Sequence, residues 1–168
     1  KEIGKLAHDN GIIFIVDAAQ SAGVLDIDAN RDNIDILCTP GHKGLYAPMG
    51  SGFIAVGDGI TLDTIIEGGT GSMSMILSQP KDLPDRLESG TLNNVAICGL
   101  AAGIDFVNSK KIDNIYNHEK SLMNMVYKEM SKNENVTLYT PDFKDAFSAP
   151  ILSFNFKDYP SEKTASLL

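Results

Sequence analysis

The sequence predicts an α/β protein, in which a mostly parallel sheet with helices is followed by the start of a smaller α+β domain. Continuous apolar, β-branched runs in the first part of the chain are typical of strands covered on both faces. These runs end in polar or glycine-rich turns. The last part shows another order, namely helix, strand, strand and the start of a helix. We therefore expect two structural units in one chain.

Three strands are expected in the first third of the chain. An amphipathic helix precedes them and ends at Asn10-Gly11, a C-terminal stop signal. Residues 11–16 form a continuous apolar run, and residues 34–38 form a second buried strand. Residues 52–56 give the third strand, which a glycine-rich turn ends. Together these runs predict a layer built on a parallel sheet.

The rest of the chain divides into an irregular segment and a second unit. Residues 61–91 lack a clear period, and such a segment in a compact domain is usually functional or part of an interface. The later elements are expected as helices at 95–108 and 112–132, strands at 136–139 and 151–156, and a helix from Ser161. We assign residues 1–109 to part of the large domain and residues 110–168 to an incomplete small C-terminal domain, because two strands and one helix bury too little surface to stand alone.

Composition argues against several classes of function. The net charge of -8 at pH 7 argues against a nucleic-acid partner, because phosphate binding needs clustered Lys and Arg. No apolar run approaches the roughly 18 residues that a membrane span needs. His8 and His118 have no second His or Cys at metal-ligand spacing, so we expect no metal site. Cys38 and Cys98 lie far apart in apolar surroundings, which indicates reduced thiols and a cytoplasmic protein.

The chain begins with Lys1-Glu2-Ile3-Gly4, which has the pattern of the middle of a helix and not of a signal peptide. We therefore expect it to be a piece of a longer protein.

Lys43 is the first candidate for chemistry. It lies in a turn between glycines, just after the second strand and next to His42. Burial and neighbouring cations depress the pKa of a lysine and free the amine for imine formation. A solvated loop lysine is the alternative. His42 is a candidate for phosphate or proton handling, with an ordinary loop histidine as the alternative.

Asp17 ends the first apolar run. An aspartate there is a helix N-cap, a metal ligand or a charge partner. Pyridoxal phosphate needs such a partner, because a carboxylate at its ring nitrogen keeps the pyridinium protonated. Gln20, one turn later, can donate to the phenolate oxygen of the cofactor from the same side. Because ligands of α/β proteins bind where parallel strands end, Asp17 and Lys43 are expected at one edge of the sheet.

Two glycine-rich segments differ in context. Residues 50–55 match the dinucleotide fingerprint in form, but they run into a strand and do not open a helix, so we discount them. Residues 69–72, Gly-Thr-Gly-Ser, present amides and two hydroxyls, which can form a phosphate nest or a simple flexible loop.

Taken together, these residues resemble the fold-type I pyridoxal-phosphate enzymes, and among them the class V aminotransferase family that includes cysteine desulfurases and selenocysteine lyases. The resemblance covers residues 1–108 and rests on five short motifs in the family's order and spacing. They are Val16-Asp17-Ala18-Ala19-Gln20, Gly41-His42-Lys43-Gly44, Pro48-Met49-Gly50-Ser51-Gly52, Gly68-Gly69-Thr70-Gly71 and Glu88-Ser89-Gly90-Thr91-Leu92-Asn93.

The resemblance implies roles for individual residues. Lys43 would form the Schiff base with pyridoxal 5'-phosphate, Asp17 would pair with the pyridine nitrogen and Gln20 would meet the 3-hydroxyl. His42 would contact the phosphate or hold the approach of the lysine. Relatives commonly have a serine that binds the phosphate three residues before the lysine, where this chain has Pro40, and Thr39 would substitute for it. Thr70 would reach the cofactor of the partner subunit in a homodimer.

The implied function is that of a central fragment of a cytoplasmic enzyme that acts on an amino acid, as a cysteine desulfurase or selenocysteine lyase does. A sulfur-acceptor protein would be a further partner. A true class V aminotransferase is the alternative within the family. A catalytically inactive α/β oligomerisation fragment is the alternative from another class, and we expect the fragment alone to be inactive. The fold implied is part of a pyridoxal-phosphate-transferase large domain.

Overall fold

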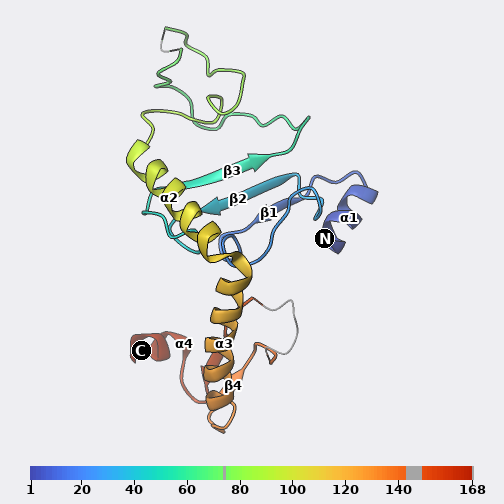
Figure 1. Cartoon of the computed structure of the whole chain (residues 1–168), viewed down its shortest axis with the longest axis vertical. Coiled ribbons are helices and arrows are strands. Elements are labelled where there is room, and N and C mark those ends of the chain that lie inside the picture. The colour runs from blue at the N-terminus through green and yellow to red at the C-terminus, as the bar shows by residue number, and fades with distance from the viewer. Residues whose placement is uncertain (74, 143–148, 168) are drawn as a thin grey trace.

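The structure is a computed structural model that describes residues 1–73, 75–142 and 149–167. Four helices and five strands are described in these ranges (Figure 1). In chain order they are α1 (Glu2–Asp9), β1 (Ile15–Asp17), β2 (Ile36–Pro40), β3 (Gly52–Val56), α2 (Asn94–Lys110), α3 (Ile112–Met130), β4 (Val136–Leu138), β5 (Phe154–Phe156) and α4 (Ser161–Leu167).

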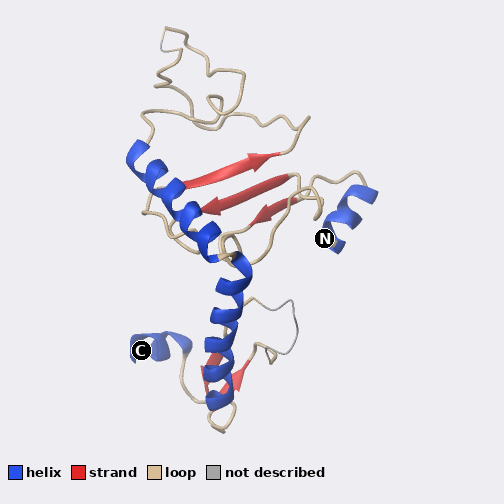
Figure 2. Cartoon of the chain, viewed as in Figure 1, coloured by secondary structure: helices blue, strands red, loops and turns tan. Residues whose placement is uncertain are grey.

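The first sheet has the strand order β1-β2-β3 and mixed direction. β1 runs parallel to β2, with Ile15 opposite Ile36 and Asp17 opposite Cys38. β3 runs antiparallel to β2 (Figure 2). The short connection 41–51 contains no crossover helix, which a parallel return would need. The expectation of a parallel sheet is therefore confirmed for β1 and β2 and is wrong for β3.

The strand expected at residues 11–16 is shorter and less covered than its sequence predicts. Only Ile15–Asp17 is strand, and the side chains of Ile12, Ile13 and Ile15 are 60%, 57% and 59% exposed. Both β1 and β3 are edge strands of the three-stranded sheet. Burial on both faces is wrong for this chain, because the described residues place no second layer over these side chains.

Helix α2 is fixed at its start and along one face. The side chain of Asn93 accepts a hydrogen bond from the Ala96 N–H at 3.2 Å and so caps the start of the helix. Its buried positions recur with helical spacing and are Ala96, Leu100, Gly103 and Val107. α2 lies beside the end of the sheet toward which β1 and β2 run (Figure 2). It therefore supports the strand ends that carry the candidate residues.

The second unit follows a sharp turn at Lys111, whose φ is +67°. α3 leads away from the sheet, and β4 and β5 pair antiparallel near its far end (Figure 1). α4 packs against β5. The helix, strand, strand and helix order that the sequence predicts is confirmed, and the division into residues 1–109 and 110–168 stays a prediction.

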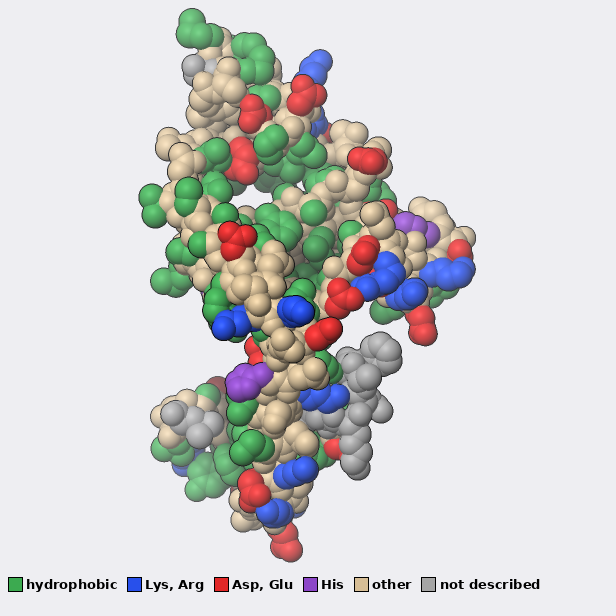
Figure 3. All heavy atoms as spheres, in the orientation of Figure 1, with side chains coloured by type: hydrophobic (Ala, Val, Ile, Leu, Met, Phe, Trp, Pro, Cys, Tyr) green, Lys and Arg blue, Asp and Glu red, His purple; other side chains and the backbone are tan. Residues whose placement is uncertain are grey.

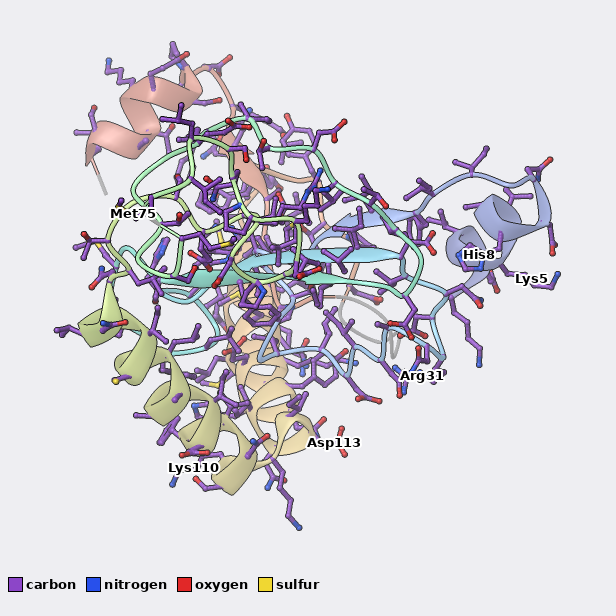
Figure 4. All side chains as sticks on the ribbon, turned by 90° about the horizontal axis from the view of Figure 1, so that it is seen from above. Lys5, His8, Arg31, Met75, Lys110 and Asp113 are labelled. Atoms are coloured by element: carbon purple, nitrogen blue, oxygen red, sulfur yellow. The ribbon has the colours of Figure 1, made fainter. Side chains whose placement is uncertain are left out.

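The link between β1 and β2 is held by ion pairs of Arg31, labelled in Figure 4. Arg31 Nη1 lies 2.6 Å from Asp26 Oδ2, and Nη2 lies 2.9 Å from Asp32 Oδ2. The hydrogen bond from Arg31 lowers the pKa of Asp32 to about 2. These pairs tie down the chain before it enters β2.

Over the described ranges, no helix is long and apolar enough to cross a membrane. The same ranges contain no group of three or more His, Cys, Asp and Glu side chains that could hold a metal ion.

Candidate active site

The parallel pairing of β1 and β2 brings their C-terminal ends to one edge of the sheet. Asp17, the last residue of β1, lies opposite Cys38. The next residue, Ala18, extends the ladder, because its N–H donates to the Cys38 carbonyl at 2.8 Å. The chain of β2 leaves the sheet two residues later, at Pro40, three residues before Lys43. The strand ends that carry the two candidate residues therefore meet, as predicted for parallel neighbours.

A tight turn follows Asp17. Asp17 Oδ1 accepts a hydrogen bond from the Ala19 N–H at 2.9 Å, and the Ala22 N–H donates to the Ala18 carbonyl at 2.9 Å. Asp17 thus caps this turn with one carboxylate oxygen, as the N-cap alternative expects. Its side chain is otherwise exposed, as is that of Gln20. The second oxygen of Asp17 has no hydrogen-bond partner among the described residues.

The turn that carries Lys43 is closed by three backbone hydrogen bonds. The Gly41 N–H donates to the Ser51 carbonyl at 2.8 Å, the Ala47 N–H to the Gly41 carbonyl at 2.9 Å and the Tyr46 N–H to the Lys43 carbonyl at 2.9 Å. Lys43 and His42 are exposed, and within the described chain neither side chain has a hydrogen-bond or ion-pair partner. The described part of the chain therefore leaves the lysine open to solvent.

The Asp17 turn and the Lys43 turn touch through two glycines. A Cβ on Gly44 would lie 2.4 Å from the Ala22 carbonyl oxygen, and a Cβ on Gly23 would lie 2.1 Å from the Gly44 carbonyl oxygen. Real Cβ atoms do not approach backbone this closely, so the contact requires glycine at both positions. The two turns are consequently packed backbone against backbone.

Helix α2 supports the Lys43 turn from another side. A Cβ on Gly103 would lie 2.1 Å from the Leu45 carbonyl oxygen, and a Cβ on Gly99 would lie 2.5 Å from Pro48 Cδ. Tyr46, with a φ of +54°, packs its ring edge-on against Phe106 at 5.1 Å between centroids. The turn is thus held between α2 and the Asp17 turn.

Thr39 lies in β2 and is 6% exposed. Its hydroxyl is 3.5 Å from the Ala18 carbonyl and 3.3 Å from the Pro40 carbonyl, to which it can donate. In this arrangement the hydroxyl stabilises the junction of the two turns, and its predicted phosphate contact stays a prediction.

Thr70 lies in the long irregular segment after β3. It is 7% exposed, and its hydroxyl has no hydrogen-bond partner among the described residues. It lines a hollow of about 310 Å³ that also includes Ser72, Asp85 and Glu88. Ser72 donates to Asp85 Oδ2 at 2.7 Å. With two acids and no base in its lining, this hollow alone does not favour a phosphate.

The loop that carries Thr70 also exposes large apolar side chains (Figure 3). Ile65, Ile66, Met75 and Leu77 are 98%, 72%, 96% and 104% exposed. Figure 4 labels Met75, which lies far from His8 on α1. We call these four side chains the apolar loop patch, and surface of this kind indicates an interaction site.

Sequence reasoning missed the residues that shape the site without carrying chemistry. They include Ser51, whose carbonyl closes the Lys43 turn, and Gln79, whose Oε1 accepts from the Gly68 N–H at 3.1 Å. They also include Gly99 and Gly103 on α2. A signal existed for these two, since glycines four residues apart in a helix interior cost stability unless a close contact needs them.

Comparison with known proteins places this geometry in a family. The chain matches the model of the class V aminotransferases over residues 1–168. It is 32% identical to a probable cysteine desulfurase of Methanothermobacter thermautotrophicus, covering 100% of this chain and 42% of that protein. It is 33% identical to a cysteine desulfurase of Enterobacter sp. strain 638, covering 99% of this chain and 41% of that protein. The chain thus spans less than half the length of these relatives.

Solved structures agree on the fold. The apo structure of a cysteine desulfurase from Thermococcus onnurineus NA1 matches with a TM-score of 0.80 and 30% identity, over 99% of this chain and 42% of that one. A cysteine desulfurase from Escherichia coli matches with a TM-score of 0.79 and 23% identity, over 97% of this chain and 40% of that one. The structure is thus part of a fold-type I pyridoxal-phosphate enzyme. The chain belongs to the class V aminotransferase family.

Class V aminotransferases and cysteine desulfurases depend on pyridoxal phosphate, as the resemblance predicted. The described side chains fit this cofactor chemically. Lys43 offers an amine without an ion-pair partner, and Asp17 offers a carboxylate with one oxygen in a hydrogen bond and the other free. Thr70 is 7% exposed as a residue, and its hydroxyl has no hydrogen-bond partner among the described residues. The roles of Asp17, Gln20, Thr39, His42, Lys43 and Thr70 stay predictions.

Proposed function

We propose that this chain is the central part of a pyridoxal-phosphate enzyme that acts on an amino acid as a cysteine desulfurase. Relatives of that name at 32% and 33% identity support the reaction. The observation that carries the proposal is the parallel pairing of β1 and β2, which holds the Asp17 turn against the Lys43 turn. An acid and a lysine on adjoining turns at the ends of parallel strands are what the cofactor requires.

Each candidate residue has a separate task in this proposal. When bound, pyridoxal phosphate supplies an aldehyde and an electron-withdrawing ring. The Lys43 amine is the nucleophile that links the protein to the aldehyde. The free oxygen of Asp17 holds a proton at the ring nitrogen, and the Gln20 amide donates to the 3-hydroxyl. His42, next to the lysine and exposed, contacts the phosphate or limits the approach of the amine.

The thiol that accepts sulfur would come from outside this chain. Cys38 lies in β2, and Cys98 lies on α2. Neither lies on a loop beside Lys43, where a mobile acceptor would be needed. The acceptor is therefore a cysteine elsewhere in the full-length protein, which then passes the sulfur to an acceptor protein. Both cysteines are free thiols, which fits a cytoplasmic location.

We further propose a homodimer in which Thr70 reaches the cofactor of the partner subunit. Thr70 lines a hollow, and its hydroxyl has no hydrogen-bond partner among the described residues, which supports this role. The acids that line its hollow argue against a phosphate held by that loop alone. The apolar loop patch supplies surface that a partner would cover.

The test of the proposed function is the visible absorption of the full-length gene product with pyridoxal phosphate, followed by borohydride reduction. We expect an absorption band and a trapped adduct on the peptide that contains Lys43. Lys43→Ala should lose both, and Lys81→Ala, which removes another exposed lysine, should lose neither. A band and an adduct that survive Lys43→Ala would show that the lysine is assigned wrongly.

The products distinguish a cysteine desulfurase from a true aminotransferase. A cysteine desulfurase forms alanine from cysteine and leaves sulfur at the level of a persulfide. A true aminotransferase instead forms a keto acid and moves the amino group to a second keto acid. Transamination without sulfur release would overturn the desulfurase assignment. The same assay on residues 1–168 alone tests the expectation that this fragment is inactive.

A further inference from the structure

The point where the two turns touch is a contact of glycine with glycine. A Cβ on Gly44 would meet the Ala22 carbonyl oxygen at 2.4 Å and Val24 Cγ2 at 3.2 Å. A Cβ on Gly23 would meet the Gly44 carbonyl oxygen at 2.1 Å. Both obstacles at the shortest distance are backbone atoms, which cannot rotate away as a side chain can. A side chain at either position would therefore push one turn away from the other.

The need for glycine at position 44 has a single physical cause. Gly23 has a φ of +83°, so its left-handed backbone already favours glycine. Gly44 does not have a left-handed φ, and an alanine there would not be strained by its backbone angles. Only the close approach to the Asp17 turn excludes a side chain. A substitution at Gly44 therefore tests the close contact alone, without the added strain of a left-handed backbone.

The Lys43 turn has little room to move back. Gly103 brings α2 against the Leu45 carbonyl, where a Cβ would lie at 2.1 Å, and Gly99 brings it against Pro48. Leu45 and Val24 are 7% and 6% exposed, so the space on both sides of the contact is filled. A Cβ at position 44 must therefore displace either Lys43, its neighbour in the chain, or the turn that begins at Asp17.

We propose that Gly23 and Gly44 are positioning residues that fix the place of the Lys43 amine relative to the Asp17 carboxylate. The inference rests on the proposed function and adds to it the contact that holds the amine and the carboxylate in their relative positions. Neither glycine touches the reacting atoms. They act by letting the two backbones approach to a distance that no other residue permits, and reaction rates depend steeply on such placement.

The reaction that reports this placement is the condensation of the Lys43 amine with the cofactor aldehyde. It forms a carbon–nitrogen double bond and releases one water, and borohydride then adds hydride to the carbon and leaves a stable secondary amine. Its rate at saturating pyridoxal phosphate depends on where the amine stands. 4'-Deoxypyridoxine 5'-phosphate has no aldehyde and cannot react with Lys43. Its affinity therefore measures the noncovalent contacts between the site and the cofactor.

The experiment compares these two readouts for Gly44→Ala in the full-length gene product. We expect adduct formation to slow by about 10-fold or more, while affinity for the aldehyde-free analogue changes by less than about 3-fold. Adduct formation at the wild-type rate would overturn the inference. So would a loss of analogue affinity equal to the loss of rate, because that result shows general damage to the site.

Gly4→Ala is the matched control. A Cβ on Gly4 would lie 2.2 Å from the Asp32 carbonyl oxygen, which is as close a backbone contact but is made by α1. It should lower stability and leave the rate of adduct formation per folded molecule unchanged. A slowed rate in Gly4→Ala would show that any backbone clash disturbs the lysine, which would also overturn the inference.

Val24→Ala covers the case in which Gly44→Ala does not fold. It removes methyl groups from the same contact and adds no clash, and it should slow adduct formation by about 3-fold or more with analogue binding kept. A wild-type rate in this variant would count against the inference. Failure of the proposed function has a different signature, because wild-type protein itself would then form no adduct.

Discussion

The two carboxylate oxygens of Asp17 have different surroundings. One oxygen accepts the Ala19 N–H at 2.9 Å and caps the turn, and the other is free of partners in the described chain. Lys43 differs, since the described structure gives its amine no partner and leaves it exposed. The acid is therefore oriented before any ligand arrives, whereas the lysine is placed only by the turn that carries it.

This difference leads to a prediction for Asp17→Asn. The amide oxygen can still accept the Ala19 N–H, so the turn should persist and cofactor should still bind. Turnover should fall by about 10²-fold or more, because a neutral amide cannot hold the proton at the ring nitrogen. Steady-state kinetics and cofactor titration measure the two effects. Near-normal turnover would show that Asp17 is only a cap.

Asp32 gives a prediction about acid stability. Its pKa is lowered to about 2 by the hydrogen bond from Arg31, so the pair stabilises the fold fully above the unfolded value near 3.8. This contribution should disappear as the pH falls from about 4 to about 2. The difference in free energy of unfolding between wild type and Asp32→Asn should therefore be constant above pH 4 and shrink below it.

Urea unfolding at a series of pH values between 7 and 2.5 measures this difference. Asp58→Asn, which changes an exposed acid outside the Arg31 pairs, is the control and should show a smaller dependence on pH. A gap between wild type and Asp32→Asn that does not change with pH would contradict the prediction.

At the scale of elements, the turn with Lys43 and helix α2 form one packed unit. Gly99 and Gly103 lie one turn apart on the helix and face the segment that includes Leu45 and Pro48. The edge-on contact of Tyr46 with Phe106 lies at the same junction. The helix therefore acts as a rigid support, and the strand ends alone do not hold the turn.

Gly103→Ala tests this packing. Alanine has the better helix propensity and would stabilise an exposed helix position by about 1 kcal/mol relative to glycine. Here its Cβ would lie 2.1 Å from the Leu45 carbonyl oxygen, so we expect destabilisation by about 1–3 kcal/mol. Denaturant unfolding measures the change, and Asn108→Ala on the exposed side of α2 should be close to neutral. A stabilised Gly103→Ala would exclude the close contact.

At the scale of the whole molecule, the candidate residues fall into two groups. Asp17, Gln20 and Lys43 follow β1 and β2 in turns that touch. Thr70 lies in the irregular segment beyond β3, beside the apolar loop patch and a hollow lined by acids. The proposed homodimer, in which each subunit completes the other's site, would join these two groups, because it would bring Thr70 to a second Lys43 turn.

Complementation tests that arrangement. Thr70→Ala and Lys43→Ala full-length proteins should each be impaired alone, since every site in each dimer lacks one residue. After subunit exchange, a mixed dimer contains one site with both residues intact, so activity should return to about one quarter of wild type for random mixing. Activity that does not recover on mixing would place Thr70 in the same subunit's site or outside the site.

The sequence by itself determined the local features of this protein. Helix ends at Asn10 and Asn93 follow from caps, which depend on neighbouring residues alone. The family was also readable, because its motifs are short runs of residues. The order of elements was predicted for the same reason, since hydrophobic period is a local property.

Only the tertiary structure decided which surfaces meet. It turned β3 antiparallel, left Ile12, Ile13 and Ile15 exposed, and packed Gly23 against Gly44. An apolar run in a sequence indicates a burial requirement but not which element covers it. A glycine in the sequence likewise indicates a flexible backbone, but it does not show which carbonyl group will pack where a Cβ would otherwise lie. The element that covers an apolar run and the group that packs against a glycine are both determined by contacts between residues distant in sequence. A local sequence pattern therefore cannot predict them.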